Sequence, residues 1–280
     1  MTSMGQTEQP TTGANAGPHC KPVFHPDRPR MKFRPLAAWH HFRILIKDKE
    51  NTEEVFRILE ALPSPNIAGR TRDFVLSDAG RKLRAAEPYL PPLLDDHAAL
   101  RRLPAGSVAQ AYLQFMESQQ LSAQGLVDEY ARFQSGRRKF DDLFEWYFNR
   151  FRDTHDLMHV LTGYSRDALG EQCVLAFSAG QNPGLGALFI AYAGALHMRR
   201  HNARGAPVVA AVREAQRHGK GRPCLAERPI LELLAQPLEE AREELGITPP
   251  RIYQQCHAQW QAQGIDPFDL LAPERDALAA

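Results

Sequence analysis

The sequence lacks a charge excess of either sign. Its 280 residues carry 34 Lys and Arg against 33 Asp and Glu, so the net charge is +1 at pH 7. A nucleic-acid-binding domain normally has a clear excess of basic residues, because neutralisation of phosphates dominates its affinity. We therefore expect no nucleic-acid partner.

Cysteine is scarce, and its spacing excludes two kinds of site. The four cysteines are widely scattered, at Cys20, Cys173, Cys224 and Cys256. No two of them have the short spacing of a zinc-binding pair, and scattered thiols suit a reducing compartment rather than a disulfide framework. We expect all four to be free thiols.

The chain also lacks a hydrophobic run long enough to cross a membrane. Its most apolar stretch, residues 183–198, has sixteen uncharged residues and ends at Arg199 and Arg200, whereas a transmembrane helix needs about 20 apolar residues. One interpretation is a small-residue helix packed in the core. The other is an apolar wall or membrane-facing surface for a lipid tail, with the arginines near phosphates or a substrate carboxylate.

Strand-like alternation is absent, and helical periodicity separated by Pro-rich or Gly-rich punctuation takes its place. We predict an all-α protein in which residues 31–280 form a single multi-helix globular domain. The expected helices cover residues 36–48, 52–62, 76–87, 107–120, 124–134, 141–162, 166–179, 184–201, 206–218, 228–235 and 237–245.

Residues 1–30 are rich in Pro, Gly, Thr and Gln and contain no apolar run, so we expect a disordered tail. Without an apolar run, this tail does not resemble a secretory signal. It does not resemble an Arg-rich transit peptide either, because no arginine precedes Arg28. A bacterial cytoplasmic location fits this composition.

One short segment contains four potential metal ligands. His155, Asp156 and His159 are followed after eleven residues by Glu171. On a helix the two histidines share one face, and Asp156 lies at the edge of that face. We expect a helix break at Gly163 and Tyr164, with Ser165 capping a second helix that carries Glu171 back over the first.

The face that holds the histidines continues an aromatic stripe formed by Phe144, Phe148 and Phe151, which predicts that it points into the core. A single buried histidine is usually satisfied by hydrogen bonds. Two imidazoles one turn apart with two carboxylates nearby favour a divalent metal site instead.

Other motifs are weaker. A metalloprotease needs Glu directly after the first His, where this chain has Asp156, and a metal-dependent phosphohydrolase needs further distant His and Asp ligands that we do not find. The pair His197 and His201 has helical spacing, but arginines surround it and no carboxylate is near in the sequence. It is typical of a solvated basic helix end.

Three segments together resemble a known family. They are RFRDTHDLMHVLTGYSRDALGEQCVLAF around the histidines, LPAGSVAQAYLQFME (Leu103 to Glu117) and LEEAREELGITPP (Leu238 to Pro250). The chain is similar over most of residues 36–255 to the fourth coenzyme Q biosynthesis protein family, whose signature is His-Asp-x-x-His, eleven residues, then Glu.

The resemblance implies a ubiquinone-pathway step, namely loss of the carboxylate from a polyprenylated 4-hydroxybenzoate-type ring, with hydroxylation of the same carbon as a coupled option. It implies a divalent ion on His155, Asp156, His159 and Glu171, with zinc first and iron, manganese or cobalt as alternatives. Asp156 and Glu171 are the candidates for proton handling.

The implied partners are the lipid substrate, the surface of the bacterial inner membrane, other quinone-biosynthesis proteins and a second copy of the chain in a homodimer. The alternative is a lipid-binding scaffold of a quinone-biosynthesis complex, in which the metal only staples two helices. Structural zinc sites usually contain thiolates, and this ligand set has none, which favours an open catalytic site.

Overall fold

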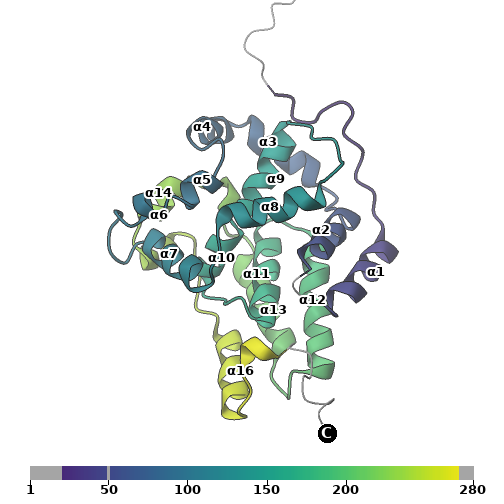
Figure 1. Ribbon diagram of the computed structural model, residues 1–280, viewed down its shortest axis with the longest axis vertical. Helices are drawn as coiled ribbons and strands as arrows, with labels where there is room; N and C mark the ends of the chain where they lie inside the picture. The colour runs from purple at the N-terminus through teal and green to yellow at the C-terminus, as the bar shows by residue number, and fades with distance from the viewer. Residues whose placement is uncertain (1–20, 49–50, 271–280) are drawn as a thin grey trace, which may run out of the picture.

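The structure, a computed structural model, describes residues 21–48 and 51–270. Helices build it, and the described residues contain no strand, which confirms the predicted all-α class. Figure 1 shows the arrangement. The helices are α1 Pro35–Leu45, α2 Thr52–Ala61, α3 Ile67–Leu76, α4 Asp78–Ala86, α5 Pro91–Leu94, α6 His97–Leu100, α7 Val108–Ser118, α8 Ala123–Phe133, α9 Leu143–Asp153, α10 His155–Thr162, α11 Ala168–Gln181, α12 Leu185–His201, α13 Val208–Gly219, α14 Ile230–Ala235, α15 Leu238–Glu244 and α16 Arg251–Ala262, with 3-10 turns at Leu225–Glu227 and Pro267–Asp269.

Helix α11 lies at the centre of the fold. Most of its residues are buried, on every side of the helix, as expected for a helix surrounded by others. It packs against α10, α12 and α13 (Figure 1), and its apolar side chains belong to the main core cluster together with those of α7, α10, α13 and α16. The position of α11 therefore decides what its first turn, including Glu171, can reach.

Two glycines allow α11 and α13 to approach each other closely. A Cβ on Gly219 would lie 2.0 Å from the backbone oxygen of Phe177, and a Cβ on Gly180 would lie 2.5 Å from that of Gln216. Such contacts are far below van der Waals separation, so any larger residue would push the helices apart.

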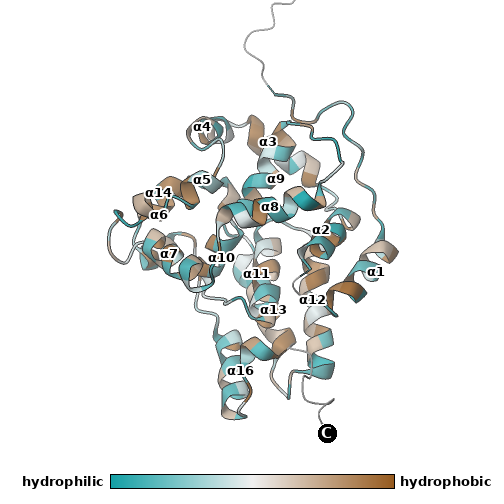
Figure 2. Cartoon of the chain, in the orientation of Figure 1, coloured by the Kyte–Doolittle hydropathy of each residue, from teal (hydrophilic) through white to brown (hydrophobic). Residues whose placement is uncertain are grey.

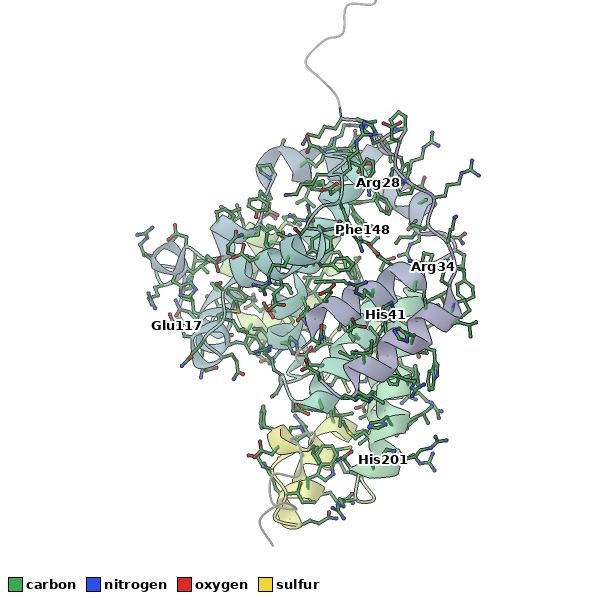
Figure 3. The ribbon with its side chains drawn as sticks, turned by 45° about the vertical axis from the view of Figure 1, so that its right-hand side comes forward. Arg28, Arg34, His41, Glu117, Phe148 and His201 are labelled. Carbon is green, nitrogen blue, oxygen red and sulfur yellow. The ribbon has the colours of Figure 1, made fainter. Side chains whose placement is uncertain are left out.

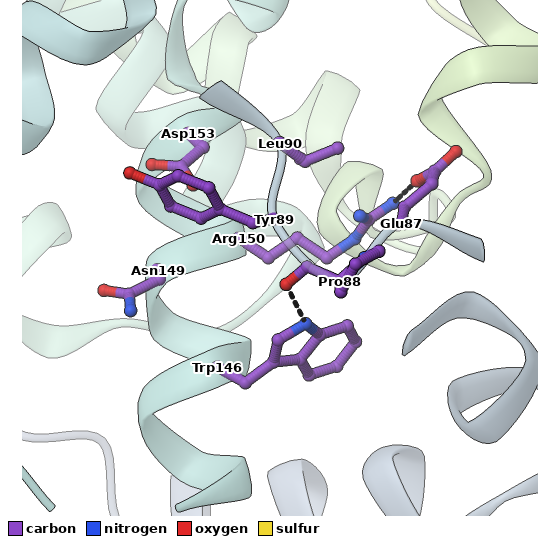
Figure 4. Close-up of a pocket in the computed structure, with 8 residues that line it drawn as sticks. All are labelled: Glu87, Pro88, Tyr89, Leu90, Trp146, Asn149, Arg150 and Asp153. Carbon is purple, nitrogen blue, oxygen red and sulfur yellow. Dashed lines mark hydrogen bonds and ion pairs between the residues drawn. The ribbon is translucent and has the colours of Figure 1, made fainter. Parts of the chain in front are cut away.

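A buried ion pair joins distant parts of the chain. Arg150 of α9 donates to the Glu87 carboxylate at 2.6 Å and to the carbonyl oxygen of Ala226, also at 2.6 Å. Glu87 in turn accepts from the backbone N–H groups of Ile230 and Leu231 at the start of α14. Figure 4 shows this pair beside a small hollow of about 40 Å³, which has room for water but not for an aromatic substrate.

Residues 21–34 run against α9 before α1 begins. Arg28 donates to both oxygens of the Asp142 carboxylate, at 2.7 and 2.8 Å. Asp142 also caps α9 by accepting from the Glu145 N–H, and it accepts from the His25 N–H. Of the expected disordered tail, residues 1–20 lie outside the described residues, whereas His25 and Arg28 form these contacts.

Several helix predictions need correction. The structure contains helices α3, α5, α6 and α16, which were not predicted, and it has two helices where one was predicted over residues 141–162. Helix α16 buries Tyr253, Cys256 and Trp260 at spacings of three and four, so its omission was an error of prediction rather than a missing pattern. Helices α3, α5 and α6 are short. Their helical state depends on packing rather than on periodicity.

Helix α12 matches the predicted apolar helix. Its inner face, including Ala187, Ile190 and Ala195, is buried, while Leu185 and Leu196 are exposed. Within the described residues, no helix has the length and apolarity needed to cross a bilayer. The core-packing interpretation therefore holds for the inner face.

Three of the four cysteines lie in the described part of the chain, and all three are free and buried. Burial raises the pKa of Cys224 to about 11 and that of Cys256 to about 12, so both thiols stay protonated and unreactive at neutral pH. Cys20 lies outside the described residues.

We predict that Gly219→Ala destabilises the protein by about 1–3 kcal/mol, because α11 and α13 must separate to admit the methyl group. Gly69→Ala is the matched control: it also lies inside a helix, but a Cβ there meets nothing within 4 Å. That change should raise stability by roughly 0.5–1 kcal/mol. Urea unfolding measures both, and equal effects would contradict the close approach.

We predict that Asp142→Asn costs about 1–3 kcal/mol near neutral pH, because a buried, charge-assisted set of hydrogen bonds is lost. Burial alone would raise the pKa of Asp142, but the Arg28 guanidinium and two backbone N–H groups hold it below its usual value.

The stabilisation by Asp142 should therefore be complete above the pKa of the unfolded carboxyl, about 3.9, and disappear as the pH falls through the lower folded pKa. Unfolding measured over a pH series should show the wild type and the variant converging in acid. Asp141→Asn, at an exposed neighbouring residue, should change little at any pH.

Candidate functional site

The histidines lie at the start of a short helix that is separate from the one before it. Helix α9 ends at Asp153, and Thr154, with φ −91° and ψ 3°, joins it to α10. The predicted continuous stripe is therefore wrong: Phe144 is buried, but Phe148 is exposed (labelled in Figure 3). The break at Thr154 changes the direction of the residues that follow.

His159 is fully buried, and its tautomer follows from its hydrogen bond. Its Nδ1 lies 2.9 Å from the backbone oxygen of Tyr164, and a carbonyl oxygen can only accept, so Nδ1 carries the proton and donates. The other nitrogen, Nε2, then holds a lone pair. The ring of Phe115 from α7 stacks on the imidazole at 5.4 Å between centroids, which fixes the plane of the ring.

Three potential ligand atoms converge on one point. The Nε2 atoms of His155 and His159 lie 3.3 Å apart, and the Oε2 atom of Glu171 lies 3.4 Å from the first and 3.5 Å from the second. The His155 side chain is 28% exposed and that of Glu171 is 36% exposed. The arrangement is therefore closed on the His159 side and open to solvent on the other.

Asp156 completes the set. One ligand atom from each of His155, Asp156 and His159 lies within 4.8 Å of the others. Burial raises the pKa of Tyr112 in α7, and the charge of Asp156 raises it further. The structure thus places Asp156 and Glu171 each beside the two histidines.

The connection between α10 and α11 returns Glu171 to the histidines. Gly163 ends α10 in the left-handed region at φ 76°, and its N–H donates to the His159 carbonyl. The predicted cap at Ser165 is wrong: Asp167 caps α11 by accepting from the Leu169 and Gly170 N–H groups. Ser165 lies too early because the connection needs two more residues to turn.

Helix α16 anchors this cap from outside. The Tyr253 hydroxyl donates to the buried Asp167 carboxylate and accepts from the Ser165 N–H at 3.1 Å. His257 Nε2 lies 3.3 Å from the same carboxylate. These contacts hold the beginning of α11 in place, and they were not predicted because α16 was not expected.

Charge links the ligand set to Arg166. Its Nε atom lies 3.6 Å from Glu171 Oε1, so one carboxylate oxygen faces the guanidinium and the other faces the imidazoles. Burial alone would lower the pKa of His155, but the hydrogen bond and charge of Glu171 raise it. Burial alone would raise the pKa of Glu171, but the two imidazoles hold it well below its usual value.

The donor set fits a small divalent cation. A tetrahedral ion with ligands at roughly 2.0–2.1 Å keeps neighbouring ligand atoms roughly 3.3–3.4 Å apart, which agrees with the three distances above. Two Nε2 atoms facing each other otherwise require one to be protonated, since two lone pairs repel. Neutral imidazole and carboxylate are ordinary ligands of zinc, iron, manganese and cobalt.

The second histidine pair has a different environment. The rings of His197 and His201 lie 4.5 Å apart near the end of α12, and neither has a carboxylate partner among the described residues. The pKa of His197 is lowered by partial burial and then by His201. This agrees with the basic helix end inferred from the sequence.

Comparisons with known proteins point to a single family. The sequence model described as coenzyme Q (ubiquinone) biosynthesis protein Coq4 matches residues 46–251. The ubiquinone biosynthesis protein COQ4 homolog, mitochondrial, of Rattus norvegicus is 28% identical over 255 residues, which cover 81% of this chain and 91% of the relative. The corresponding protein of Mus musculus is 31% identical over 175 residues, covering 61% of each chain.

A solved structure shares the fold. The crystal structure of a candidate ubiquinone biosynthesis protein from Nostoc punctiforme superposes with a TM-score of 0.52 at 17% identity. The match covers 76% of this chain and 98% of the other. At this identity the likeness concerns the fold alone.

Proposed function

Because the chain belongs to the coenzyme Q (ubiquinone) biosynthesis protein Coq4 family and therefore has a role in ubiquinone biosynthesis, we propose that it is a metal-dependent carboxy-lyase of that pathway. Its substrate is a polyprenylated 4-hydroxybenzoate-type acid. The observation that carries the proposal is the convergence of the His155, His159 and Glu171 ligand atoms at 3.3–3.5 Å. The protein works at the surface of the bacterial inner membrane, beside other quinone-biosynthesis proteins.

Four residues hold the ion: His155, Asp156, His159 and Glu171. Zinc suits this set of nitrogen and oxygen ligands best, and iron, manganese or cobalt suit it as well. When bound, a divalent ion supplies Lewis-acid chemistry that orients the oxygens of the aromatic ring, and a redox-active ion also supplies oxygen chemistry.

The reaction replaces a ring carboxylate. In the simple form, the ring carbon bearing the carboxylate gains a proton, the bond to the carboxylate breaks, its electron pair restores the ring and carbon dioxide leaves. In the oxidative form, one atom of dioxygen bonds to that carbon, the bond to the carboxylate breaks and carbon dioxide leaves, while a two-electron donor and two protons convert the other oxygen atom to water. The para phenolate supplies electron density in both forms.

The protein residues divide the remaining work. The Tyr164 carbonyl and the Phe115 ring keep His159 Nε2 aimed at the site, and Arg166 orients Glu171. The guanidinium of Arg166 lies beside the exposed side of the site, where it can also attract the carboxylate of the substrate. Asp156, which is partly exposed, delivers the proton, because the imidazoles hold the pKa of Glu171 well below its usual value and keep that carboxylate ionised.

The alternative is a scaffold in which the metal only staples α10 to α11. A staple needs a closed ligand shell, and structural zinc sites usually contain cysteine thiolates. The partial exposure of His155 and Glu171 and the burial of the described cysteines elsewhere in the core favour an open site. We therefore propose catalysis as the primary role.

We predict that the purified protein binds one divalent ion per chain and that His159→Ala weakens this binding more than about tenfold. His201→Ala is the matched control, because that histidine also lies one helical turn from another but has no carboxylate near it. Metal analysis after dialysis measures both, and circular dichroism checks folding. Full occupancy in His159→Ala would contradict the ligand assignment.

In the cobalt-substituted protein, we expect 4-hydroxybenzoate to change the visible spectrum of the metal, because an open coordination site accepts the ring oxygens. A stapled, closed site would leave the spectrum unchanged. This measurement separates the enzyme from the scaffold without requiring the native lipid.

We predict that the metal-loaded protein releases carbon dioxide from a prenylated 4-hydroxybenzoate and that Asp156→Asn slows this release by about 10²–10⁴ fold if Asp156 carries the proton. The same assay under air and under argon distinguishes the two forms of the reaction. Release only in air, with a reductant present, indicates the oxidative form. Absence of release under both conditions would overturn the proposed activity.

A further inference from the structure

Large apolar side chains are exposed on one side of the molecule, around the start of α1. Leu36 is 85% exposed, Phe33 63% and Trp39 52%. Met31 and Phe33 also line a shallow hollow that is completed by Leu185 at the start of α12. We call these five residues the α1 patch. Figure 2 shows hydrophobic segments along α1 and the adjoining part of α12.

The patch is not an unfinished piece of core. The opposite face of α1 is fully used, since Ala38, Phe42 and Leu45 are buried against Ile58 of α2 and Ile190 of α12. The Trp39 ring stacks on the Phe42 ring of this cluster, with 5.8 Å between the ring centroids. Contiguous exposed apolar side chains of this size normally mark a binding surface.

Basic residues surround the patch without acidic partners. Between Pro29 and Lys47 the sequence has no Asp or Glu. The exposed cations of this segment form no ion pair with any carboxylate among the described residues, whereas the preceding Arg28 is paired with Asp142. These unpaired cations are Arg30, Lys32, Arg34, Arg43 and Lys47; Figure 3 labels Arg34.

We propose that the α1 patch docks onto the surface of an anionic phospholipid bilayer. Basic side chains beside exposed Trp, Phe, Leu and Met are the combination that such a surface binds, because phosphates attract the cations while the apolar groups enter the interface. Trp in particular favours this depth. Charge complementarity therefore selects the partner.

A second copy of the chain fits this surface less well. In a twofold dimer the same patch meets itself, so the cations of both copies would face one another without any carboxylate between them. Like charges so arranged repel. A protein partner would need its own acidic, apolar surface, whereas an anionic bilayer offers both features everywhere.

This inference deepens the proposed function and rests on it, because the proposed lipid substrate explains why the protein would bind a membrane. Helix α12, which contributes Leu185 to the patch, packs directly against α11, which carries Glu171. The patch and the metal site are nevertheless built from different residues. A variant of one can therefore be tested without altering the other.

Vesicle sedimentation tests the proposal with the full-length protein. The wild type should bind vesicles that contain phosphatidylglycerol and bind pure phosphatidylcholine vesicles much more weakly. The triple change Arg30→Gln, Lys32→Gln and Arg34→Gln should weaken the first binding about a hundredfold. The triple change Phe33→Ser, Leu36→Ser and Trp39→Ser should abolish it.

Matched controls remove the same groups elsewhere. Lys82→Gln, Arg102→Gln and Arg132→Gln together delete three exposed cations from other elements, and Leu231→Ser removes an exposed leucine of α14. Both controls should bind vesicles like the wild type. Circular dichroism and thermal unfolding confirm that each patch variant is folded before its binding is compared.

Quenching by lipids with brominated acyl chains reports insertion. It should reduce the fluorescence of the wild type but not of Trp39→Phe, because Trp260 is fully buried and Trp146 donates to Pro88 on another face. His159→Ala should bind vesicles normally even if it has lost metal and activity, which separates failure of this inference from failure of the enzyme assignment.

Two results would overturn the proposal. One is equal binding of the patch variants and the control variants to anionic vesicles. The other is a wild-type dimer in light scattering that the patch variants turn into a monomer without any change in vesicle binding, which would assign the patch to a second copy of the chain.

Discussion

The turn between α10 and α11 is the constraint on which the candidate site depends. Three of the proposed ligands come from α10 and one from the first turn of α11, so their meeting requires the chain to reverse within a few residues. The left-handed Gly163 ends the first helix and Asp167 starts the second. The carbonyl oxygen of Tyr164, which lies in this turn, also accepts a hydrogen bond from His159 Nδ1. One turn thus returns Glu171 and orients the buried imidazole.

The rest of the structure supports this turn from several sides. Arg242 of α15 donates to the carbonyl oxygens of Val160 and Leu161 at the end of α10, which satisfies groups that a helix end leaves unpaired. Tyr253 of α16 holds the Asp167 cap, and Gly219 lets α13 press closely on α11. Contacts from α15 therefore hold α10, and contacts from α13 and α16 hold α11. Metal ligands require such support to keep their geometry.

Sequence patterns predicted the central helices because their apolar periodicity is strong. The same patterns did not predict where one helix ends and the next begins. Nothing in the run from Leu143 to Thr162 marks Thr154 as a break, since threonine is only a moderate helix breaker and the apolar spacing continues through it. Phe148 lies before this break, within α9, and is 38% exposed, which the apolar spacing did not predict.

Helical spacing places His155 and His159 on one face, because 3.6 residues complete a turn. Gly163 is the residue type that adopts a left-handed conformation without strain. These local features follow directly from the order of the residues. The approach of distant segments depends instead on how the helices pack. The 3.4 Å contact of Glu171 with His155, the ion pair with Arg166 and the anchoring of Asp167 by α16 arise from packing of α11 in the core. Burial free energy summed over many side chains sets that packing, and no short motif encodes such a sum.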